Sequence, residues 1–453
     1  MRLYVKKLLQ ILLAGFLLVV IYLNLNVMDM GFDAQHRNGA LPWGGNFRHA
    51  PRHLPTFFGK GIHDYVLHNR LMQNSSRPFV LKRPSIYPSL DQYSDDRIVS
   101  QLQFIPQSLQ DQKEVPLKKI LVYSGLSSWS IPRGQTLFKE QKCAVSSCTL
   151  LDEHSKLDEA DVVLFQHSVS QRDPKKSMNQ IWALFMLESP YHTMTFSSSR
   201  SFFNWTATYR HDSTIVAPYE KFVPFNSSVQ PPRPKNYAEG KTKKVAWFVS
   251  NCGARNGRRQ YANELSQYIQ VDIYGACGTL KCPRFQNNKC FEMLNKDYKF
   301  YLAFENSNCR DYITEKFFIN GLKHDVIPIV MGAAPEDYQR AAPPHSFIHV
   351  DDFESPKELA EYLLKLDKDD TLYNSYFAWK GTGDIINTFF WCRMCALAND
   401  VPNRGPSWFE DVESWWRGPG VCIGQQTWRR TPHNKTIADL AITLKERTLA
   451  TSN

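Results

Sequence analysis

Short apolar runs that end in small or polar residues recur along the middle of the chain. In the first series these runs are LKKILVYSG (117–125), EADVVLFQH (159–167) and IWALFMLESP (181–190). Each run has the length of a buried strand, and the stretches between the runs are long enough for helices. This alternation predicts a parallel α/β architecture.

A second series of apolar runs follows a proline-rich break at residues 229–244. Its members are VAWFVSN (245–251), VDIYG (271–275), KFYLAFEN (299–306), VIPIVMG (326–332) and SFIHVDD (346–352). We therefore predict an α/β protein with two Rossmann-like domains that face each other across a cleft, at residues 116–235 and 236–395. Ligands of such sheets bind outside the carboxyl ends of the strands.

The longest apolar run lies near the N-terminus, from Leu8 to Leu25, and basic residues precede it. Its roughly 18 residues are just long enough to cross a bilayer. A cleaved signal peptide has a similar basic start, but this run exceeds the usual apolar centre and no small residues of the Ala-x-Ala kind follow it. We predict a transmembrane signal-anchor at residues 8–25, with residues 1–7 in the cytosol and the remainder in the lumen.

The segments at either end of the two α/β halves have a different texture. Residues 26–115 are rich in His, Arg, Pro, Ser and Gln and have few sustained apolar patterns, so we interpret them as a stem that is flexible in part. Residues 396–453 are expected to be a C-terminal tail that packs back on the body, with a disordered end.

Cysteine usage agrees with a lumenal body, and the charge sets a limit on partners. All ten cysteines lie beyond residue 140, and an even number suits an oxidising compartment. The net charge of +10 comes from dispersed Lys and Arg without any nucleic-acid-binding motif, so we expect no nucleic-acid partner. A positive field also suits an anionic diphosphate, although a solvated basic surface explains most of these residues.

The stretch FYLAFENSNCRDYITEKFF (300–318) gathers polar side chains where an apolar run ends. We predict that Asp311 caps a helix that begins at Tyr312. Tyr312, Glu315 and Lys316 would then share one face of its first turn, where free N–H groups favour an anion. Lys316 could neutralise a diphosphate and Glu315 could accept hydrogen bonds from sugar or ribose hydroxyls. By physics alone, a solvated Glu and Lys and a packing Tyr are an equally good interpretation.

This stretch, continued by IPIVMGAAPEDY (327–338) and SFIHVDDF (346–353), resembles the donor-binding signature of the α1,3-fucosyltransferases. The strings SNCGARNGRRQ (250–260) and VDIYGACG (271–278) are similar to the core-type branch, which fucosylates the innermost GlcNAc of N-glycans. Two further elements of the family appear as LESP (187–190) and NWTATYR (204–210). The resemblance covers roughly residues 117–425, and the stem and tail are unmatched.

The resemblance implies a GT-B fold and inverting transfer of fucose from GDP-fucose. The base of the family is the Glu of its ESP element, which the resemblance places at Glu188. An inverting transfer needs one such carboxylate near the incoming hydroxyl. A glutamate before Ser-Pro could also merely cap a turn, and the nearby His192 is more often a structural residue. The residues that match donor contacts of the family are Arg258 and Lys316 for the diphosphate, Asn306, Tyr312 and Glu315 for the nucleoside and fucose, and Ser250 and Asn251 at a strand end. Arg258 is the alignment choice among Arg255, Arg258 and Arg259. A choice is needed because a one-residue slip is possible in that loop.

The NWTATYR element is expected to shape the acceptor side through Trp205, Tyr209 and Arg210, with core packing as a near-equal alternative. The same element contains the sequon of Asn204, which will carry no glycan if it is buried. The glycosylation candidates are therefore Asn74, Asn226 and Asn434.

Two motifs of the sequence could in principle bind a metal or exchange thiols, and a structural role is the better interpretation of each. The Asp-x-Asp triplet in LDKDD (366–370) lies in a charged helical stretch, and we interpret it as a solvated face. The resemblance implies catalysis with no obligatory metal site and leaves Mn²⁺ at most a stimulatory role. Structural disulfides are favoured over thiol exchange or a zinc site for WCRMC (391–395), because no thioredoxin-like unit and no second close pair accompany it. The family pattern implies that Cys392 and Cys395 pair with Cys143 and Cys148, and it leaves the other pairings open.

Together these features predict a single-pass type II enzyme of the Golgi membrane with a lumenal catalytic body. GDP-fucose would be its donor, and the core GlcNAc of an N-glycan or N-glycoprotein its acceptor. Two alternatives stay open at this point. One is a Lewis-type transferase acting on LacNAc or LacdiNAc antennae, and the other is a catalytically silent glycan- or nucleotide-binding relative. The oligomeric state cannot be read from the sequence.

Overall fold

The computed structural model describes residues 86–88, 96–110, 115–167, 176–177, 179–225, 235–283, 287–401 and 407–430. The expected cytosolic tail and anchor, most of the stem, and the sequons of Asn74, Asn226 and Asn434 lie outside these residues. Within the described ranges, no helix has both the length and the apolar character needed to cross a membrane.

The first sheet has six parallel strands in the order β2-β1-β3-β4-β5-β6. Their bounds are β1 Lys118–Val122, β2 Cys148–Leu151, β3 Val162–Phe165, β4 Ile181–Met186, β5 Trp205–Thr208 and β6 Ile215–Val216. The predicted runs form β1, β3 and β4, which are almost wholly buried, as expected for strands covered on both faces.

Three strands of this sheet were not predicted, because their apolar pattern is short or interrupted by threonine. In β5, the buried hydroxyl of Thr208 bonds that of Ser213 at 2.6 Å, and Thr206 accepts from the backbone of Thr214 at 3.2 Å. These partners satisfy the polar groups inside the core, so β5 stays buried despite its polar residues.

Short helices connect and flank this sheet. They are α3 Ile98–Gln103, α4 Gln107–Gln110, α5 Thr136–Glu140, η4 His154–Glu159, η5 Pro190–His192, α12 Phe390–Ala398 and α13 Val412–Arg417. Two further short helices are η3 Ser127–Trp129 and η10 Trp428–Arg430, and Trp428 of η10 donates to the carbonyl of Gly332 in the second half at 2.9 Å.

Helix α3 belongs to the folded body, although it falls in the expected stem. The guanidinium of Arg97 donates to the carbonyls of His211 and Ser213 at 2.8 Å, and Gln101 donates to the carbonyl of Thr214 at 3.0 Å. Arg393 of α12 donates in turn to the Gln101 side chain at 3.2 Å. The folded body therefore begins before residue 116.

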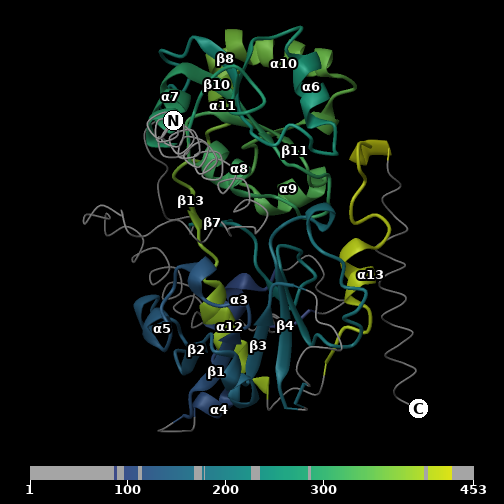
Figure 1. Ribbon diagram of the computed structural model, residues 1–453. Coiled ribbons are helices and arrows are strands. Elements are labelled where there is room, and N and C mark those ends of the chain that lie inside the picture. The colour runs from purple at the N-terminus through teal and green to yellow at the C-terminus, as the bar shows by residue number, and fades with distance from the viewer. Residues whose placement is uncertain are drawn as a thin grey trace, which may run out of the picture. The chain divides into compact units, whose positions relative to one another are not determined.

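The second sheet has five parallel strands in the order β12-β11-β10-β8-β9. Its strands β8, β10 and β11 are labelled in Figure 1. Their bounds are β8 Lys243–Phe248, β9 Val271–Tyr274, β10 Tyr298–Phe304, β11 Ile327–Met331 and β12 Ile348–His349. All five correspond to predicted apolar runs, and every residue of the central strand β10 is buried. The helical elements of this half are α6 Arg258–Leu265, α7 Asn287–Asp297, α8 Glu315–Phe317, η7 Phe318–Leu322, α9 Pro335–Ala341, η8 Val350–Asp352, α10 Pro356–Lys368 and α11 Asp370–Ser375.

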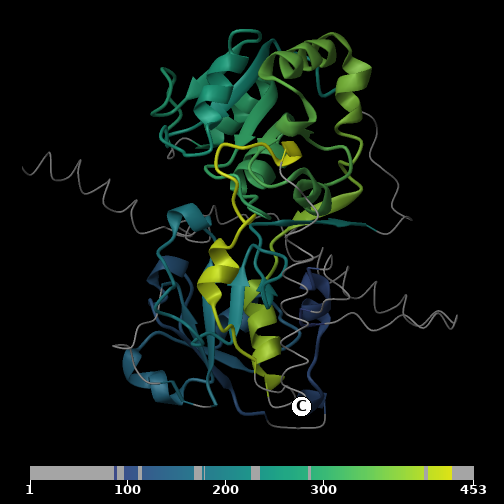
Figure 2. The ribbon, with the colours of Figure 1, turned by 90° about the vertical axis from the view of Figure 1, so that its right-hand side faces the viewer.

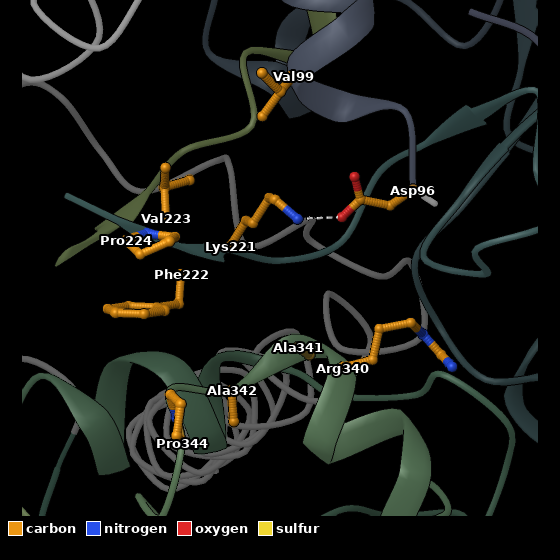
Figure 3. A pocket seen from close by; sticks show the side chains of 10 residues that line it. All are labelled: Asp96, Val99, Lys221, Phe222, Val223, Pro224, Arg340, Ala341, Ala342 and Pro344. Atoms are coloured by element: carbon orange, nitrogen blue, oxygen red, sulfur yellow. Dashed lines mark hydrogen bonds and ion pairs between the residues drawn. The ribbon is translucent and has the colours of Figure 1, made fainter. Parts of the chain in front are cut away.

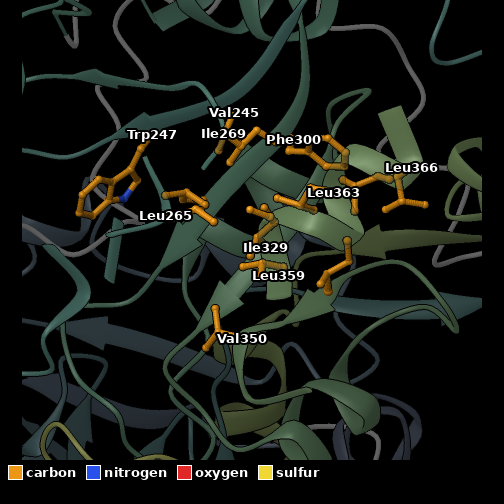
Figure 4. Packing of buried hydrophobic residues seen from close by; sticks show 14 of the residues in the cluster. Val245, Trp247, Leu265, Ile269, Phe300, Ile329, Val350, Leu359, Leu363 and Leu366 are labelled. Carbon is orange, nitrogen blue, oxygen red and sulfur yellow. The ribbon is translucent and has the colours of Figure 1, made fainter. Parts of the chain in front are cut away.

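Helix α10 shows how the sequence builds the core of this half. Ser355 caps it by accepting from the backbone of Glu358 at 3.3 Å, and Pro356 occupies its first turn. Leu359, Leu363 and Leu366 then fall on one face and are fully buried in the cluster that Figure 4 shows. Burial of each leucine contributes about 2 kcal/mol of transfer free energy.

A small antiparallel sheet joins the two chain segments that connect the halves, β7 (Lys221–Pro224) and β13 (Gly383–Ile386). After β13 the chain forms α12, which carries Cys392 and Cys395. These pair with Cys143 and Cys148, as the family pattern implied. Helix α12 thus packs with the first sheet, although the predicted boundary placed it in the second domain.

Three further disulfides pair the remaining cysteines: Cys252–Cys277, Cys282–Cys290 and Cys309–Cys422. The last of them ties the segment after α13 to the loop that follows β10, and this segment is the yellow trace in Figure 2. Five disulfides that use all ten cysteines indicate folding in an oxidising compartment such as the secretory pathway.

Candidate active site

The candidate base lies two residues beyond the carboxyl end of β4. Glu188 is exposed, whereas Leu187 and Ser189 on either side of it are buried. The backbone N–H of Ser189 donates to Oε1 of Glu188 at 2.8 Å, and Tyr219 donates to the carbonyl of Leu187 at 3.0 Å. The turn therefore holds the carboxylate at the strand end and presents it to solvent. His192, the other residue weighed here, is also exposed.

The loop after β10 differs from the prediction in one respect. The helix begins at Glu315 and not at Tyr312, and Thr314 is its cap. Asp311 has a φ of 60°, which a right-handed helix cannot contain. The argument that Tyr312, Glu315 and Lys316 share a helical face is therefore wrong, because Tyr312 lies in the loop before the helix.

This loop nevertheless brings the predicted residues to Glu188. The hydroxyl of Tyr312 donates to Oε1 of Glu188 at 2.6 Å, and the amide of Asn306 donates to the same oxygen at 3.3 Å. Burial, together with the Glu188 charge, holds the pKa of Tyr312 well above its usual value, so the phenol stays a donor. The strand ends of the two sheets thus meet at the carboxylate.

Lys316 lies next to this contact and uses all three of its N–H bonds. They go to Oε2 of Glu305 at 3.0 Å, the hydroxyl of Thr314 at 2.9 Å and Oε1 of Glu315 at 3.3 Å. Burial alone would lower the pKa of Lys316, but the two carboxylates outweigh it and raise that pKa. The ammonium therefore stays charged.

Sequence reasoning missed Glu305, the first residue after β10. Its side chain is 0% exposed and accepts from the backbone and hydroxyl of Thr314 at 2.8 and 2.9 Å as well as from Lys316. Burial raises the pKa of its carboxyl, and the Lys316 cation opposes that rise. An acid directly after an unbroken apolar strand is the signal that could have identified it.

Gly332 makes room for this buried acid. A Cβ at this position would lie 2.6 Å from Cγ of Glu305, which is closer than real Cβ contacts come. The φ of Gly332 is +151°, which other residues rarely adopt. The glycine that ends the run VIPIVMG is therefore required by the packing of Glu305.

The residues after β8 surround the same strand ends. Ser250 and Asn251 are exposed, whereas Arg258 is buried at the start of α6. The Arg258 guanidinium donates to the carbonyls of Phe304 at 2.8 Å and Asn251 at 2.9 Å, and burial lowers its pKa. In this structure Arg258 thus joins the ends of β8 and β10 and contributes positive charge beneath them.

The three residues expected on the acceptor side have different surroundings. Trp205 is buried in β5, and the buried ring of Tyr209 lies 5.1 Å from that of Tyr312. Arg210 donates to Asp212 at 2.9 Å and lies over the ring of Trp415. Trp205 is therefore a core residue, whereas Tyr209 supports the tyrosine that binds Glu188.

The amide of Asn204 is also engaged inside the protein. Its nitrogen donates to the carbonyl of Ser407 at 2.8 Å, and its oxygen accepts from the backbone of Trp182 at 2.9 Å. Because a glycan would attach to that same nitrogen, these bonds disfavour glycosylation at this sequon.

The Asp-x-Asp triplet in residues 366–370 is a solvated face only in part: Lys368 and Asp369 are exposed, as expected, whereas Asp367 is half-buried. Asp367 accepts from Lys244 at 2.7 Å and from Lys299 at 3.1 Å, and Lys299 is almost fully buried. The first aspartate therefore neutralises lysines that lie near the start of the second sheet. Across the ranges that the structure describes, no group of three or more His, Cys, Asp or Glu side chains could hold a metal ion.

Two parallel sheets, with a carboxylate at the strand ends of one next to a half-buried lysine–acid cluster at the strand ends of the other, form a GT-B-like α/β fold whose polar groups gather where such sheets bind ligands. Two family models match the chain. Residues 116–220 match the fucosyltransferase N-terminal model, and residues 238–415 match the C-terminal model of glycosyltransferase family 10 (fucosyltransferase). The chain therefore belongs to glycosyltransferase family 10, the fucosyltransferases.

Curated relatives and solved structures carry related names. The chain is 54% identical over 359 residues to "Glycoprotein 3-alpha-L-fucosyltransferase A" of Drosophila melanogaster, with 78% of this chain and 71% of the fly protein covered. It is 36% identical over 321 residues to "Alpha-(1,3)-fucosyltransferase C" of the same organism, with 64% and 73% covered. A crystal structure of an alpha1,3-fucosyltransferase superimposes with a TM-score of 0.45 at 16% identity, over 66% of this chain and 94% of that one.

Proposed function

We propose that this protein transfers L-fucose from GDP-β-L-fucose, with inversion, in α1,3 linkage to the Asn-linked core GlcNAc of N-glycans. The observation that carries the proposal is the Glu188 carboxylate, held by Tyr312 and Asn306 beside the Lys316 cluster. The relative named as a glycoprotein fucosyltransferase supports the core acceptor over an antenna.

Glu188 is suited to act as the base because its two oxygens have different environments. Oε1 accepts all three hydrogen bonds that the described residues donate to this carboxylate, from Ser189, Asn306 and Tyr312. Oε2 is left to accept the proton of the incoming hydroxyl. Fixing one oxygen therefore orients the other, which is what general-base catalysis of an inverting transfer requires.

Lys316 is suited to bind the diphosphate by exchanging one partner. Its contact with Glu315 is the longest of its three, and Glu315 is the more exposed of the two acids. A phosphate oxygen can replace that contact, while Glu305 and Thr314 keep the ammonium in position. Glu315 is then released to accept hydrogen bonds from ribose or fucose hydroxyls. Arg258 adds to the positive charge beneath the loop, and Ser250 and Asn251 remain candidates for donor contacts.

We further propose that no metal is obligatory, since Lys316 and Arg258 supply the positive charge for the leaving GDP. Activity that is lost with EDTA and restored by Mn²⁺ would contradict this scheme.

We place the enzyme in the Golgi membrane as a single-pass type II protein, anchored by residues 8–25 with the body in the lumen. The disulfides agree with a lumenal body. Protease treatment of sealed vesicles tests this orientation, because a lumenal body stays protected until detergent is added.

The test of the acceptor uses the full chain, GDP-fucose and a defined N-glycopeptide. Tandem mass spectrometry should place the added deoxyhexose on the GlcNAc that is linked to asparagine. The matched control is a free LacNAc or LacdiNAc antenna, which should gain no fucose. Fucose on the antenna alone would establish the Lewis-type alternative, and GDP-fucose binding without transfer would establish a silent relative.

A further inference from the structure

We propose that Asp311, together with His211, is a positioning pair for the transfer: it fixes the loop that carries Tyr312 against the turn after β5 and so keeps Tyr312 on Glu188. The inference rests on the proposed function, since it assumes that Glu188 is the base. It adds two residues that touch no reacting atom in this structure.

Asp311 accepts three hydrogen bonds through its side chain and donates a fourth through its backbone. Oδ2 of Asp311 accepts from the backbone N–H of His211 at 3.1 Å and lies 2.5 Å from Nδ1 of its ring. Oδ1 accepts from Arg340 at 2.6 Å, and Arg340 also donates to Asp337 at 2.6 Å. The backbone N–H of Asp311 itself donates to Asp337 at 2.8 Å. His211 comes from the first sheet, whereas Asp337 and Arg340 belong to α9 in the second half.

The backbone of Asp311 is held in a costly conformation. Its φ of 60° lies in the left-handed region, which costs a residue other than glycine about 1 kcal/mol or more and persists only where the surroundings hold it. The bonds from both sides of the loop supply that restraint. Because the next residue is Tyr312, this backbone turn aims the phenol at Glu188.

The same turn after β5 supplies a second contact to Tyr312. Tyr209, two residues before His211, places its ring 5.1 Å from the Tyr312 ring. A shift of the turn would therefore move the ring that packs on Tyr312 and the residue that holds Asp311 at once. The pair thus couples the phenol to the first sheet, which also carries Glu188.

Both members of the pair are titratable, and the charged groups around His211 change the pH at which its ring loses a proton. The charged groups around His211 are Asp311 and Arg340 across the contact, Asp212 on its own turn, and Arg97, which donates to the His211 carbonyl. Burial alone would lower the pKa of His211, but Asp311 outweighs it and raises that pKa. Burial and the Asp311 charge raise the pKa of Asp337, and the Arg340 charge opposes that rise.

Solvent reaches this network at Arg340, whose side chain is 30% exposed, whereas that of Asp311 is 8% exposed. Arg340 lines a cavity of about 440 Å³, and the other charged residues in its wall are Lys221 and Asp96, which pair with each other (Figure 3). The two acids are therefore buried, and Arg340 is the member of the network that contacts solvent.

The test uses Asp311→Asn in the full chain, because asparagine tolerates a positive φ but removes the charge. We expect kcat to fall about tenfold to a hundredfold, while the Kd for GDP and the KM for GDP-fucose change much less. The matched control is Asp325→Asn, which removes an acid that binds Lys235 and Lys380 in the second half and contacts neither Tyr312 nor Glu188. It should lower the melting temperature and leave kcat near the wild-type value.

A second variant, His211→Asn, keeps the proposal falsifiable if Asp311→Asn does not fold. The wild-type kcat should decline as pH rises through the pKa of His211, and His211→Asn should have a lower kcat that no longer shows this decline. A wild-type kcat in Asp311→Asn overturns the proposal, as does an unchanged pH profile in His211→Asn. If Asp311→Asn does not fold, a normal kcat in His211→Asn also overturns the proposal. Loss of GDP binding in Asp311→Asn would instead indicate that the donor site has collapsed and would reject a positioning role. An inactive wild type would refute the proposed function itself.

Discussion

The pairing of Lys316 with Glu305 makes a quantitative prediction for Lys316→Met. Methionine keeps most of the length of the side chain and removes the ammonium, so Glu305 would lose its cation while remaining 0% exposed. Removing one partner of a buried ion pair costs about 3–5 kcal/mol of unfolding free energy. For a folded unit of about 150–250 residues, each kcal/mol of lost unfolding free energy lowers the melting temperature by about 2–4 °C. We therefore expect the melting temperature to decrease by about 6–20 °C.

The measurements are thermal unfolding followed by circular dichroism and GDP binding by calorimetry. GDP affinity should fall at least about tenfold, because the phosphate loses a charge-assisted bond. The double variant Glu305→Gln/Lys316→Met should recover much of the melting temperature and none of the affinity. The control Lys357→Met removes an exposed lysine that lies 4.0 Å from Glu361, and it should change neither quantity appreciably.

Each outcome of this experiment distinguishes a different error. An unchanged melting temperature would refute the buried pair. A lower melting temperature with normal GDP affinity would keep the pair and refute the placement of the diphosphate.

Three further predictions follow from the site and its supports. Glu188→Gln should bind GDP normally and lower kcat by about 10²–10⁴-fold in the glycopeptide assay, and a near-normal rate would remove Glu188 as the base. Replacing Cys309 and Cys422 by serine should lower the unfolding free energy by about 2–5 kcal/mol in urea titrations, and an unchanged midpoint would argue against this pairing. The folded pKa of His211 is raised above 6.5, so its stabilisation is complete below that value and is lost as pH rises through the folded pKa. The stability difference between the wild type and His211→Asn should therefore shrink as pH rises through the folded pKa of His211, and a constant or growing difference would contradict the ion pair with Asp311.

The sequence alone determined the strands of the second sheet and the central strands of the first. Such strands are buried on both faces and therefore appear in the sequence as unbroken apolar runs. The residues of each strand are then enough to predict that it is buried. It also placed Glu188, Asn306 and Lys316 at strand ends, where the topology of parallel sheets gathers ligands. Family resemblance added the pairing of Cys143 and Cys148 with Cys392 and Cys395, which spacing could not supply.

Only the tertiary structure decided the features that depend on partners distant in sequence. The left-handed Asp311 and the late start of the helix are fixed by His211, Asp337 and Arg340, so local propensity around Tyr312 gave the wrong boundary. Glu305 looks like an ordinary acid after a strand until Lys316 and Thr314 enclose it. Helix α3 has the composition of a stem, yet it is held through Gln101 and neighbouring contacts to the first sheet. Local patterns record how apolar surface is buried, whereas the free energy of these polar groups depends on donors and charges that the fold brings from elsewhere in the chain.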